Sequence, residues 1–217
     1  MQLPNNSERL TIIGKTGSGK THAGLWHLSV RDFKIPWVIF DTKDAGDFAE
    51  IEHIHEINIS KPKIKQGLNI VYPILPDEIQ KMNNLLYLIW REGNCGVFID
   101  EAMDFGKLNS YEKILRQGRG KQIPVIQLSQ RPSNITQLAF NQTEFFQIFY
   151  IQDDRERQRV KEMTGIPKEK IASLPASRES LYFSQYENTP HILMPLPPLT
   201  IITDRINNKL SLKIIHL

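Results

Sequence analysis

Short apolar runs in the first two thirds of this chain alternate with longer stretches in which apolar residues recur at helical spacing. The run RLTIIG, residues 9–14, predicts a first strand, and residues 20–33 predict the helix after it. This alternation is typical of βαβ units, in which helices cover a mostly parallel sheet. The same pattern predicts strands over 36–43, 68–74, 96–102, 123–132 and 145–152, and helices over 76–91, 109–117 and 153–165.

The last part of the chain departs from this alternation. Its residues LMPLPPLTII, 193–202, are rich in proline, which lacks the backbone N–H that a central strand or a helix interior needs. We therefore expect residues 172–217 to form edge strands or a proline-rich arm. With no linker or repeat in the chain, we expect residues 1–217 to form a single domain with its core at about 8–165.

Length and composition fit one globular unit with a single core. The chain has 217 residues, of which 40% are hydrophobic and 24% charged, and no apolar run approaches the roughly 18 residues that a membrane span needs. We therefore expect a protein without an intrinsic membrane span. The formal net charge of +3 permits a nucleic-acid partner but does not require one.

The segment GKTGSGKT, residues 14–21, matches the phosphate-binding pattern G-x-x-x-x-G-K-[ST] in the context it requires, between a strand and a helix. Its glycines allow backbone N–H groups to surround an anion at a helix N-terminus. Lys20 would bring a mobile charge to the β- and γ-phosphates of a nucleoside triphosphate, and the Thr21 hydroxyl is suited to Mg²⁺. The nucleotide-binding residues predicted here are Gly14, Lys15, Thr16, Gly17, Ser18, Gly19, Lys20 and Thr21.

Two adjacent carboxylates follow the apolar run GVFI. On that strand Asp100 would hold Mg²⁺ through its water shell, and Glu101 would polarise a water for in-line attack on the γ-phosphate. This arrangement favours ATP hydrolysis over binding alone. A third polar position ends the next strand, VIQLSQRP, where Gln130, with Ser129 as the second choice, would sense the γ-phosphate. A polar residue in this place lies between the strand before the phosphate loop and the strand before the two carboxylates, if one additional strand separates those two.

Asp41 and Lys43 end the predicted second strand, where ligands collect in open α/β sheets. We expect Asp41 to take part in the nucleotide site. Lys43 could face either the nucleotide or DNA.

Four segments in order resemble the FtsK/HerA superfamily of DNA-pumping ATPases. They are GKTGSGKT, VIFDTK, VFIDEA and RGKQIPVIQLSQRP, which together span residues 10–132. The final QRP is the most discriminating part, because general P-loop proteins share only the first and third segments. In its small size and its lack of a membrane segment, the chain resembles the genome-packaging ATPases of tailless icosahedral viruses with an internal membrane, the tectivirus-type phages.

The resemblance implies an α/β fold: a three-layer αβα, RecA-like P-loop core with a mostly parallel sheet, an additional strand and a catalytic glutamate. It also implies a homo-oligomeric ring, commonly a hexamer, in which an arginine from one subunit completes the next subunit's ATP site. Arg119, eleven residues before Gln130, fits that position, and Arg116 is the reserve candidate.

The expected function is an ATP-hydrolysing translocase that uses Mg²⁺ and packages viral double-stranded DNA, without sequence reading, into a preformed capsid. Its partners would be capsid-vertex or membrane-associated packaging proteins, and its location the host cytoplasm or the virion packaging vertex. The alternatives are a filamentous-phage-type assembly or secretion ATPase at the inner membrane, a conjugation-type DNA-pumping ATPase, a small-molecule kinase, and a nucleotide-gated structural subunit without useful turnover.

Overall fold

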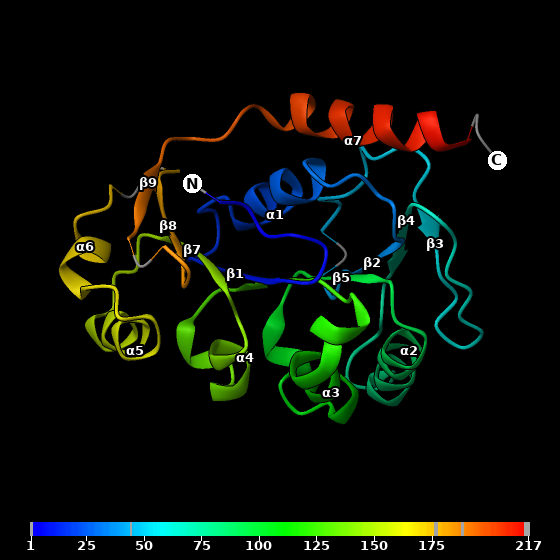
Figure 1. The fold of residues 1–217 in the computed structure, drawn as a ribbon, viewed down its shortest axis with the longest axis horizontal. Coiled ribbons are helices and arrows are strands. Elements are labelled where there is room, and N and C mark those ends of the chain that lie inside the picture. Colours follow the sequence, from blue (N-terminus) through cyan, green and yellow to red (C-terminus); the bar gives the residue numbers. More distant parts are fainter. Residues whose placement is uncertain (1, 44, 176–177, 188, 215–217) are drawn as a thin grey trace.

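One twisted sheet runs through the whole molecule and carries the helices on its two faces (Figure 1). The computed structural model describes residues 2–43, 45–175, 178–187 and 189–214. Across these residues the sheet has nine strands in the order β3-β4-β2-β5-β6-β1-β7-β8-β9. The strands are β1 (Arg9–Ile13), β2 (Trp37–Phe40), β3 (His55–Glu56), β4 (Leu68–Val71), β5 (Gly96–Ile99), β6 (Val125–Ser129), β7 (Phe145–Phe149), β8 (Ser180–Ser184) and β9 (His191–Leu193).

The helices form a layer on each side of the sheet. Figure 1 shows α1 and α7 on one face and α2, α3 and α4 on the other. The α-helices are α1 (Lys20–Ser29), α2 (Ile79–Glu92), α3 (Asn109–Gln117), α4 (Gln137–Asn141), α5 (Asp154–Thr164), α6 (Lys168–Ala172) and α7 (Leu199–Ile214). Three short 3-10 helices are interspersed among the described residues: η1 (Ala102–Phe105), η2 (Gly118–Lys121) and η3 (Pro132–Asn134). The expected three layers are therefore present.

Successive residues of the central strands feed two separate cores. In β2, Val38 and Phe40 pack into the core under α2 and α3, whereas Trp37 and Ile39 pack into the core under α1 and α7. All four side chains are fully buried. Burial on both faces is the reason that these parallel strands read as continuous apolar runs rather than as an alternation of apolar and polar residues.

Strand β6 lies between β1 and β5 and pairs in parallel with both. The first seven strands of the sheet order all run parallel, and β7, β8 and β9 pair antiparallel at one edge. The strand before the phosphate loop is therefore separated from the Asp100 strand by one strand. The predicted fold class, with its additional strand and mostly parallel sheet, is confirmed.

Two helix boundaries differ from the sequence expectation. The first helix was expected to extend to Phe33, but α1 ends at Ser29, and Phe33 has a positive φ of 51°, which no α-helix accommodates. The second was expected from Pro76, but α2 begins at Ile79 after a turn. Amphipathic spacing continues past a helix end when the following turn also buries an apolar side chain, as Phe33 does.

The C-terminal segment contains a helix that the proline pattern did not predict. Strands β8 and β9 form the expected edge, and the chain then crosses the molecule to α7 (Figure 1). Helix α7 begins at Leu199, directly after Pro197 and Pro198, where proline no longer interrupts it. The expectation that residues 199–202 could not be helical is wrong.

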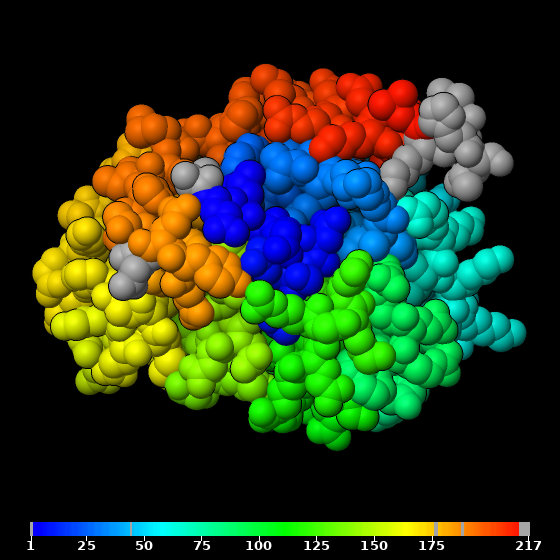
Figure 2. Space-filling model, in the orientation of Figure 1, coloured from blue at the N-terminus to red at the C-terminus, as the bar shows by residue number. Residues whose placement is uncertain are grey.

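Helix α7 covers α1, which is the helix that follows the phosphate loop. Its buried residues Ile202, Ile206 and Leu210 lie in the same core as Leu25 and Leu28 of α1. Figure 2 shows the C-terminal segment as a continuous layer over α1 along one side of the molecule. None of the helices in the described part of the chain has the length and apolarity that a membrane span requires.

Candidate functional site: a nucleotide cleft at the carboxyl ends of the central strands

The loop between β1 and α1 has the backbone geometry of an anion-binding loop. Gly17 and Gly19 have φ values of 78° and 97°, which residues with a Cβ rarely adopt. A Cβ on Gly14 would lie 2.6 Å from Ser18 Oγ and 2.8 Å from Phe149 Cβ. Gly19 is also the N-cap of α1 and offers no side-chain acceptor to its first N–H groups. Those N–H groups remain available for phosphate oxygens.

The loop opens onto a cleft of about 390 Å³. This volume falls in the range of small-molecule sites. Its lining brings together the ends of β2 and β6, the phosphate loop and the segment before β8, which are far apart in the sequence. The lining residues are Thr16, Gly17, Gly19, Lys20, Thr21, His22, Lys43, Ala45, Asp47, Gln130 and Arg178.

Lys20 lies at the centre of the cleft. Its Nζ donates a hydrogen bond to the Lys15 carbonyl across the loop, at 2.9 Å. Burial, and after it the positive charge of Lys43, lowers the pKa of Lys20 to about 8, although Glu101 and Asp100 oppose the shift. An ammonium whose charge is only partly compensated by its surroundings is suited to receiving phosphate oxygens.

Thr21 and Asp100 meet beneath the loop. The Thr21 hydroxyl donates a hydrogen bond of 3.1 Å to Asp100 Oδ1. Asp100 directly follows β5, and its side chain is 1% exposed. The structure therefore brings together the two residues predicted as Mg²⁺ ligands, although 79 positions separate them in the sequence.

Glu101 lies next to this pair and carries two unpaired oxygens. Its Oε1 and Oε2 atoms are buried and have no hydrogen-bond partner among the described residues. Burial raises the pKa of Glu101, and the charges of Lys43 and Lys20 partly counteract that rise. A buried carboxylate without hydrogen bonds is costly, which is the pattern of a group that awaits a substrate or a water.

Lys43 contacts both carboxylates. Its Nζ lies 2.8 Å from Asp100 Oδ2, 3.3 Å from the Asp100 carbonyl and 3.7 Å from Glu101 Oε2. Burial alone would lower the pKa of Lys43, but the hydrogen bond and the charge of Asp100 outweigh it, so that this pKa is raised. Of the two environments expected for Lys43, the structure places it in the nucleotide cleft.

Gln130 follows β6 and lines the cleft, as expected for a γ-phosphate sensor. Ser129, the second choice, is fully buried, and its hydroxyl donates to the Arg131 carbonyl at 2.9 Å. The geometry therefore favours Gln130 over Ser129.

Asp41 does not reach the wall of the cleft. Its side chain is buried, and Oδ1 accepts a hydrogen bond of 3.1 Å from the backbone N–H of Lys43. This contact closes the turn after β2 and directs the following residues. The structure thus gives Asp41 a place behind Lys43 and outside the lining of the nucleotide cleft.

Arg116 and Arg119 lie at the opposite ends of the strands from the cleft. They belong to α3 and η2, which lead into the amino end of β6, whereas the cleft lies at the carboxyl ends of the strands. Arg116 pairs with Glu112 on the same helix at 2.8 Å. Arg119 is exposed, and its side chain makes no ion pair or hydrogen bond with the described residues. Neither arginine joins the cleft of its own subunit.

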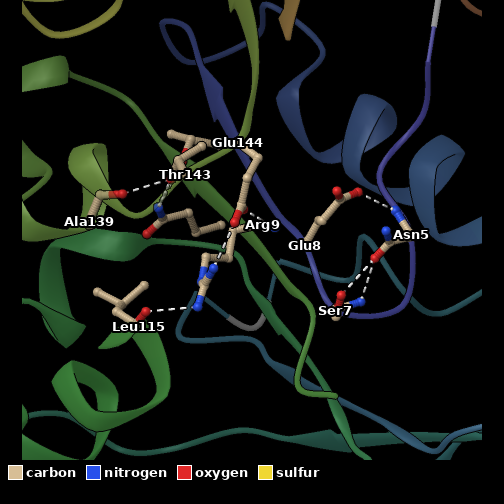
Figure 3. Close-up of polar contacts among 10 residues, drawn as sticks. Asn5, Ser7, Glu8, Arg9, Leu115, Ala139, Thr143 and Glu144 are labelled. Carbon is tan, nitrogen blue, oxygen red and sulfur yellow. Dashed lines mark hydrogen bonds and ion pairs between the residues drawn. The ribbon is translucent and has the colours of Figure 1, made fainter. Parts of the chain in front are cut away.

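A buried ion pair anchors the helix that precedes Arg119. Figure 3 shows Arg9, the first residue of β1, between Glu144 and the end of α3. Its guanidinium bonds Glu144 Oε1 and the Leu115 carbonyl, both at 2.8 Å. Both side chains of the pair are nearly inaccessible, 3% and 10% exposed. The strand that carries the phosphate loop is therefore connected directly to the last turn of α3.

A search of curated proteins finds a relative along almost the whole chain. The chain is 34% identical over 214 residues to the DNA packaging ATPase P9 of Enterobacteria phage PRD1, which covers 94% of each protein. No family model matches the chain. At this identity and coverage, common descent is established. The chain belongs to the family of the phage DNA packaging ATPase P9.

Solved structures share the fold of this packaging-ATPase family member. The genome packaging NTPase B204 of Sulfolobus turreted icosahedral virus 2, in complex with ATP-gammaS, aligns with a TM-score of 0.74 at 18% identity, over 89% of this chain and 100% of that chain. The pCW3 conjugation coupling protein TcpA aligns with a TM-score of 0.66 at 15% identity, over 95% of this chain and 65% of that chain. The likeness to phage genome-packaging ATPases expected from the sequence is confirmed by the relative P9, and the solved structures confirm the fold.

Two charged cleft residues of this packaging-ATPase family member were not assigned from the sequence. The side chain of Arg178 passes over the phosphate loop, with Cγ 3.9 Å from the position that a Cβ on Gly19 would take. Asp47 lies nearby in the lining. Neither belongs to a recognisable motif, and only the fold brings them to the loop. For Lys43, the VIFDTK segment marked the residue but not its contact with Asp100.

Proposed function

We propose that this protein is an ATP-hydrolysing motor that drives viral double-stranded DNA into a preformed capsid. The observation that carries the proposal is the 34% identity to DNA packaging ATPase P9 across 94% of both chains. The cleft supports it, because Lys20, Thr21 and Gln130 line one space next to the loop. Asp100 accepts a hydrogen bond from Thr21 at the side of this space.

The phosphate loop would bind the nucleotide. The N–H groups at the start of α1 and the Lys20 ammonium surround the position of the β- and γ-phosphates. The positive φ values of Gly17 and Gly19 hold the loop in the open form that admits them. The Ser18 hydroxyl is buried without a partner among the described residues, so it is available to a ligand or water at this site.

The residues of the cleft fit Mg²⁺. Thr21 and Asp100 place two oxygen atoms 3.1 Å apart at the edge of the phosphate position, and oxygen donors with few protein ligands are what Mg²⁺ prefers beside a triphosphate. When bound, the ion would neutralise charge on the phosphates. The two oxygens of Glu101 are buried without a hydrogen bond among the described residues, so each can still accept one from a water.

Hydrolysis follows from the placement of Glu101. In the proposed step, Glu101 accepts a proton from a water whose oxygen attacks the γ-phosphorus, and the bond between that phosphorus and the oxygen bridging to the β-phosphate breaks. The products are ADP and inorganic phosphate. Gln130, across the cleft, contacts the γ-phosphate and reports its loss through β6, which lies between the two nucleotide-binding strands.

The position of Arg119 supports a ring. An exposed arginine at the end of the strands opposite to the cleft cannot serve its own subunit, but in a head-to-tail assembly it would face the next subunit's nucleotide. An arginine finger accelerates turnover about 10³- to 10⁵-fold in other nucleotide hydrolases, so assembly would control activity. We propose a homo-oligomeric ring, commonly a hexamer in this superfamily, that acts in the host cell and at the virion packaging vertex on the phosphates of the duplex.

Steady-state phosphate release tests this function. The rate per subunit is measured against protein concentration, with and without double-stranded DNA, at low and at moderate salt. We expect the rate to rise with concentration and with DNA, and the effect of DNA to weaken with salt, because phosphate contacts dominate non-specific binding. The Glu101→Gln variant is the control for a contaminating ATPase.

A flat rate that is indifferent to DNA would contradict the motor. It would favour a small-molecule kinase or a structural subunit gated by nucleotide. The likeness to the coupling protein TcpA concerns the fold alone and does not support a conjugation-type pump. No contact described in the cleft favours that function over packaging.

A further inference from the structure

Lys43 is a charged side chain of the cleft to which the motifs of the phosphate loop and β5 assign no role. It lies two residues after Asp41 in the turn that follows β2, and its side chain is 32% exposed and lines the nucleotide cleft. The turn is held in place, because Asp41 accepts from the Lys43 N–H and donates its own N–H to the Val71 carbonyl. Lys43 is therefore presented to the cleft by a hydrogen-bonded turn whose first residue, Asp41, is buried.

The two side-chain oxygens of Asp100 accept hydrogen bonds from different residues, one of which is Lys43. Oδ2 accepts from Lys43 at 2.8 Å, and Oδ1 accepts from Thr21 at 3.1 Å. A second bond, to the Asp100 carbonyl at 3.3 Å, ties the same ammonium to the backbone at the end of β5. With Oδ2 engaged, the carboxylate is held with Oδ1 toward Thr21, the other residue expected to hold Mg²⁺. Groups that orient a metal ligand in this manner strongly influence the site.

Lys43 is also the nearest cation to Glu101. Its Nζ lies 3.7 Å from Glu101 Oε2, and in the described part of the chain no other ammonium or guanidinium lies within 4.0 Å of that carboxylate. Lys20, another cation of the cleft, donates its hydrogen bond to the Lys15 carbonyl. Because neither oxygen of Glu101 has a hydrogen bond among the described residues, the charge of Lys43 is the strongest attraction on this carboxylate, ahead of the charge of Lys20.

We propose that Lys43 is a positioning residue of the hydrolytic step and the counter-ion of the Asp100–Glu101 pair. It holds Asp100 with Oδ1 toward the metal and Glu101 toward the attacking water. The same charge repels Mg²⁺, so its presence raises the Mg²⁺ concentration that nucleotide binding requires. This inference rests on the proposed function for its hydrolytic part, whereas the effect on Mg²⁺ can be observed without turnover.

Three variants separate these effects. Lys43→Met removes the charge and keeps the aliphatic stem, Lys43→Arg retains the charge, and Lys61→Met is the matched control, an exposed lysine outside the cleft. The first readout is the anisotropy of a fluorescent, non-hydrolysable ATP analogue, titrated with Mg²⁺. The second is kcat and KM for ATP, together with the fraction of bound nucleotide recovered as ATP. The thermal midpoint confirms that each variant is folded.

We expect Lys43→Met to lower severalfold the Mg²⁺ concentration for half-maximal binding of the analogue. We also expect kcat to fall about 10- to 100-fold, the usual effect of losing a group that orients a metal ligand, with KM changed much less. Unhydrolysed ATP should accumulate on the protein. Lys43→Arg should keep the Mg²⁺ requirement of the unmodified protein and recover a large part of kcat, and Lys61→Met should change neither.

Several results would overturn the proposal. If Lys43→Met leaves the Mg²⁺ requirement unchanged or raises it, Lys43 does not compete with the ion. If kcat stays within twofold of the unmodified protein, Lys43 does not position the reacting groups. Should Lys43→Met fail to fold, Lys43→Gln replaces it, with the same expectations. A protein that binds the analogue but never releases phosphate contradicts the proposed function instead, and the Mg²⁺ titration still decides the role of Lys43.

Discussion

At the scale of single residues, the cleft separates binding of the triphosphate from its hydrolysis. Lys20 follows the loop and donates a hydrogen bond across it to the Lys15 carbonyl, whereas Glu101 follows β5 and has two buried oxygens without a hydrogen bond among the described residues. The two side chains influence each other's pKa but share no hydrogen bond in the described part of the chain. Substitution of Lys20 should therefore affect nucleotide binding, whereas substitution of Glu101 should affect hydrolysis.

Lys20→Ala should abolish nucleotide binding, because it removes the charge that neutralises the β- and γ-phosphates. Glu101→Gln keeps the volume and should preserve binding but lower turnover about 10²- to 10⁴-fold, since it removes the base for the attacking water. Equilibrium binding of labelled ATP and the ratio of ATP to ADP on the protein after incubation measure both effects. An equal loss of binding in the two variants would contradict the role given to Glu101.

At the scale of elements, α1 is held by partners on both sides. Its first turn carries the phosphate loop, and α7 packs against its outer face through Ile202, Ile206 and Leu210. The His22 ring also contacts the Pro197 carbonyl, with 2.7 Å between Nε2 and oxygen, which connects the first turn of α1 to the crossing segment. The C-terminal helix therefore stabilises the element that positions the loop.

Ile206→Ala should lower the free energy of unfolding by about 2 to 5 kcal/mol, because it opens a cavity between α7 and α1. The matched control on the same helix is Ile201→Ala, whose side chain is 50% exposed and whose loss should change stability by no more than about 0.5 kcal/mol. Urea denaturation followed by circular dichroism measures both. Equal effects for the two variants would mean that α7 does not pack on α1 in solution.

At the scale of the whole molecule, the two ends of the parallel strands carry different groups. The cleft lies at the carboxyl ends, and Arg119 lies at the amino ends with the buried Arg9–Glu144 pair, which connects β1 to the end of α3. A head-to-tail ring would bring the amino ends of one subunit's strands to the next subunit's cleft.

Mixing Arg119→Ala subunits with Lys20→Ala subunits should restore part of the ATPase activity that each variant lacks alone. In the mixture, an intact cleft can meet an intact Arg119 from a neighbour. Phosphate release is measured at constant total protein while the ratio of the two variants is changed. Activity that stays at the level of the separate variants at every ratio would count against a finger acting between subunits, and repeating the series with Arg116→Ala tests the reserve candidate.

The parts of the fold that the sequence predicted are those specified locally. The phosphate loop lies within eight consecutive residues, 14–21, and its glycines determine the backbone directly. Helix α3 begins and ends where its apolar spacing predicts, at Asn109 and Gln117. Helix α7 escaped prediction because the prolines before it dominate the local pattern, and its stability comes from packing on α1 rather than from its own sequence.

The sequence by itself determined the chemistry of this protein: a loop for phosphate, an oxygen pair suited to Mg²⁺, a carboxylate for water and a polar residue at the end of β6. Tertiary structure alone decided which distant groups join them. Lys43 meets Asp100 across 57 positions, and Arg178 reaches the loop from the segment before β8. The physical reason is that backbone conformation and hydrophobic spacing are local properties, whereas strand order brings together side chains whose separation along the chain carries no signal.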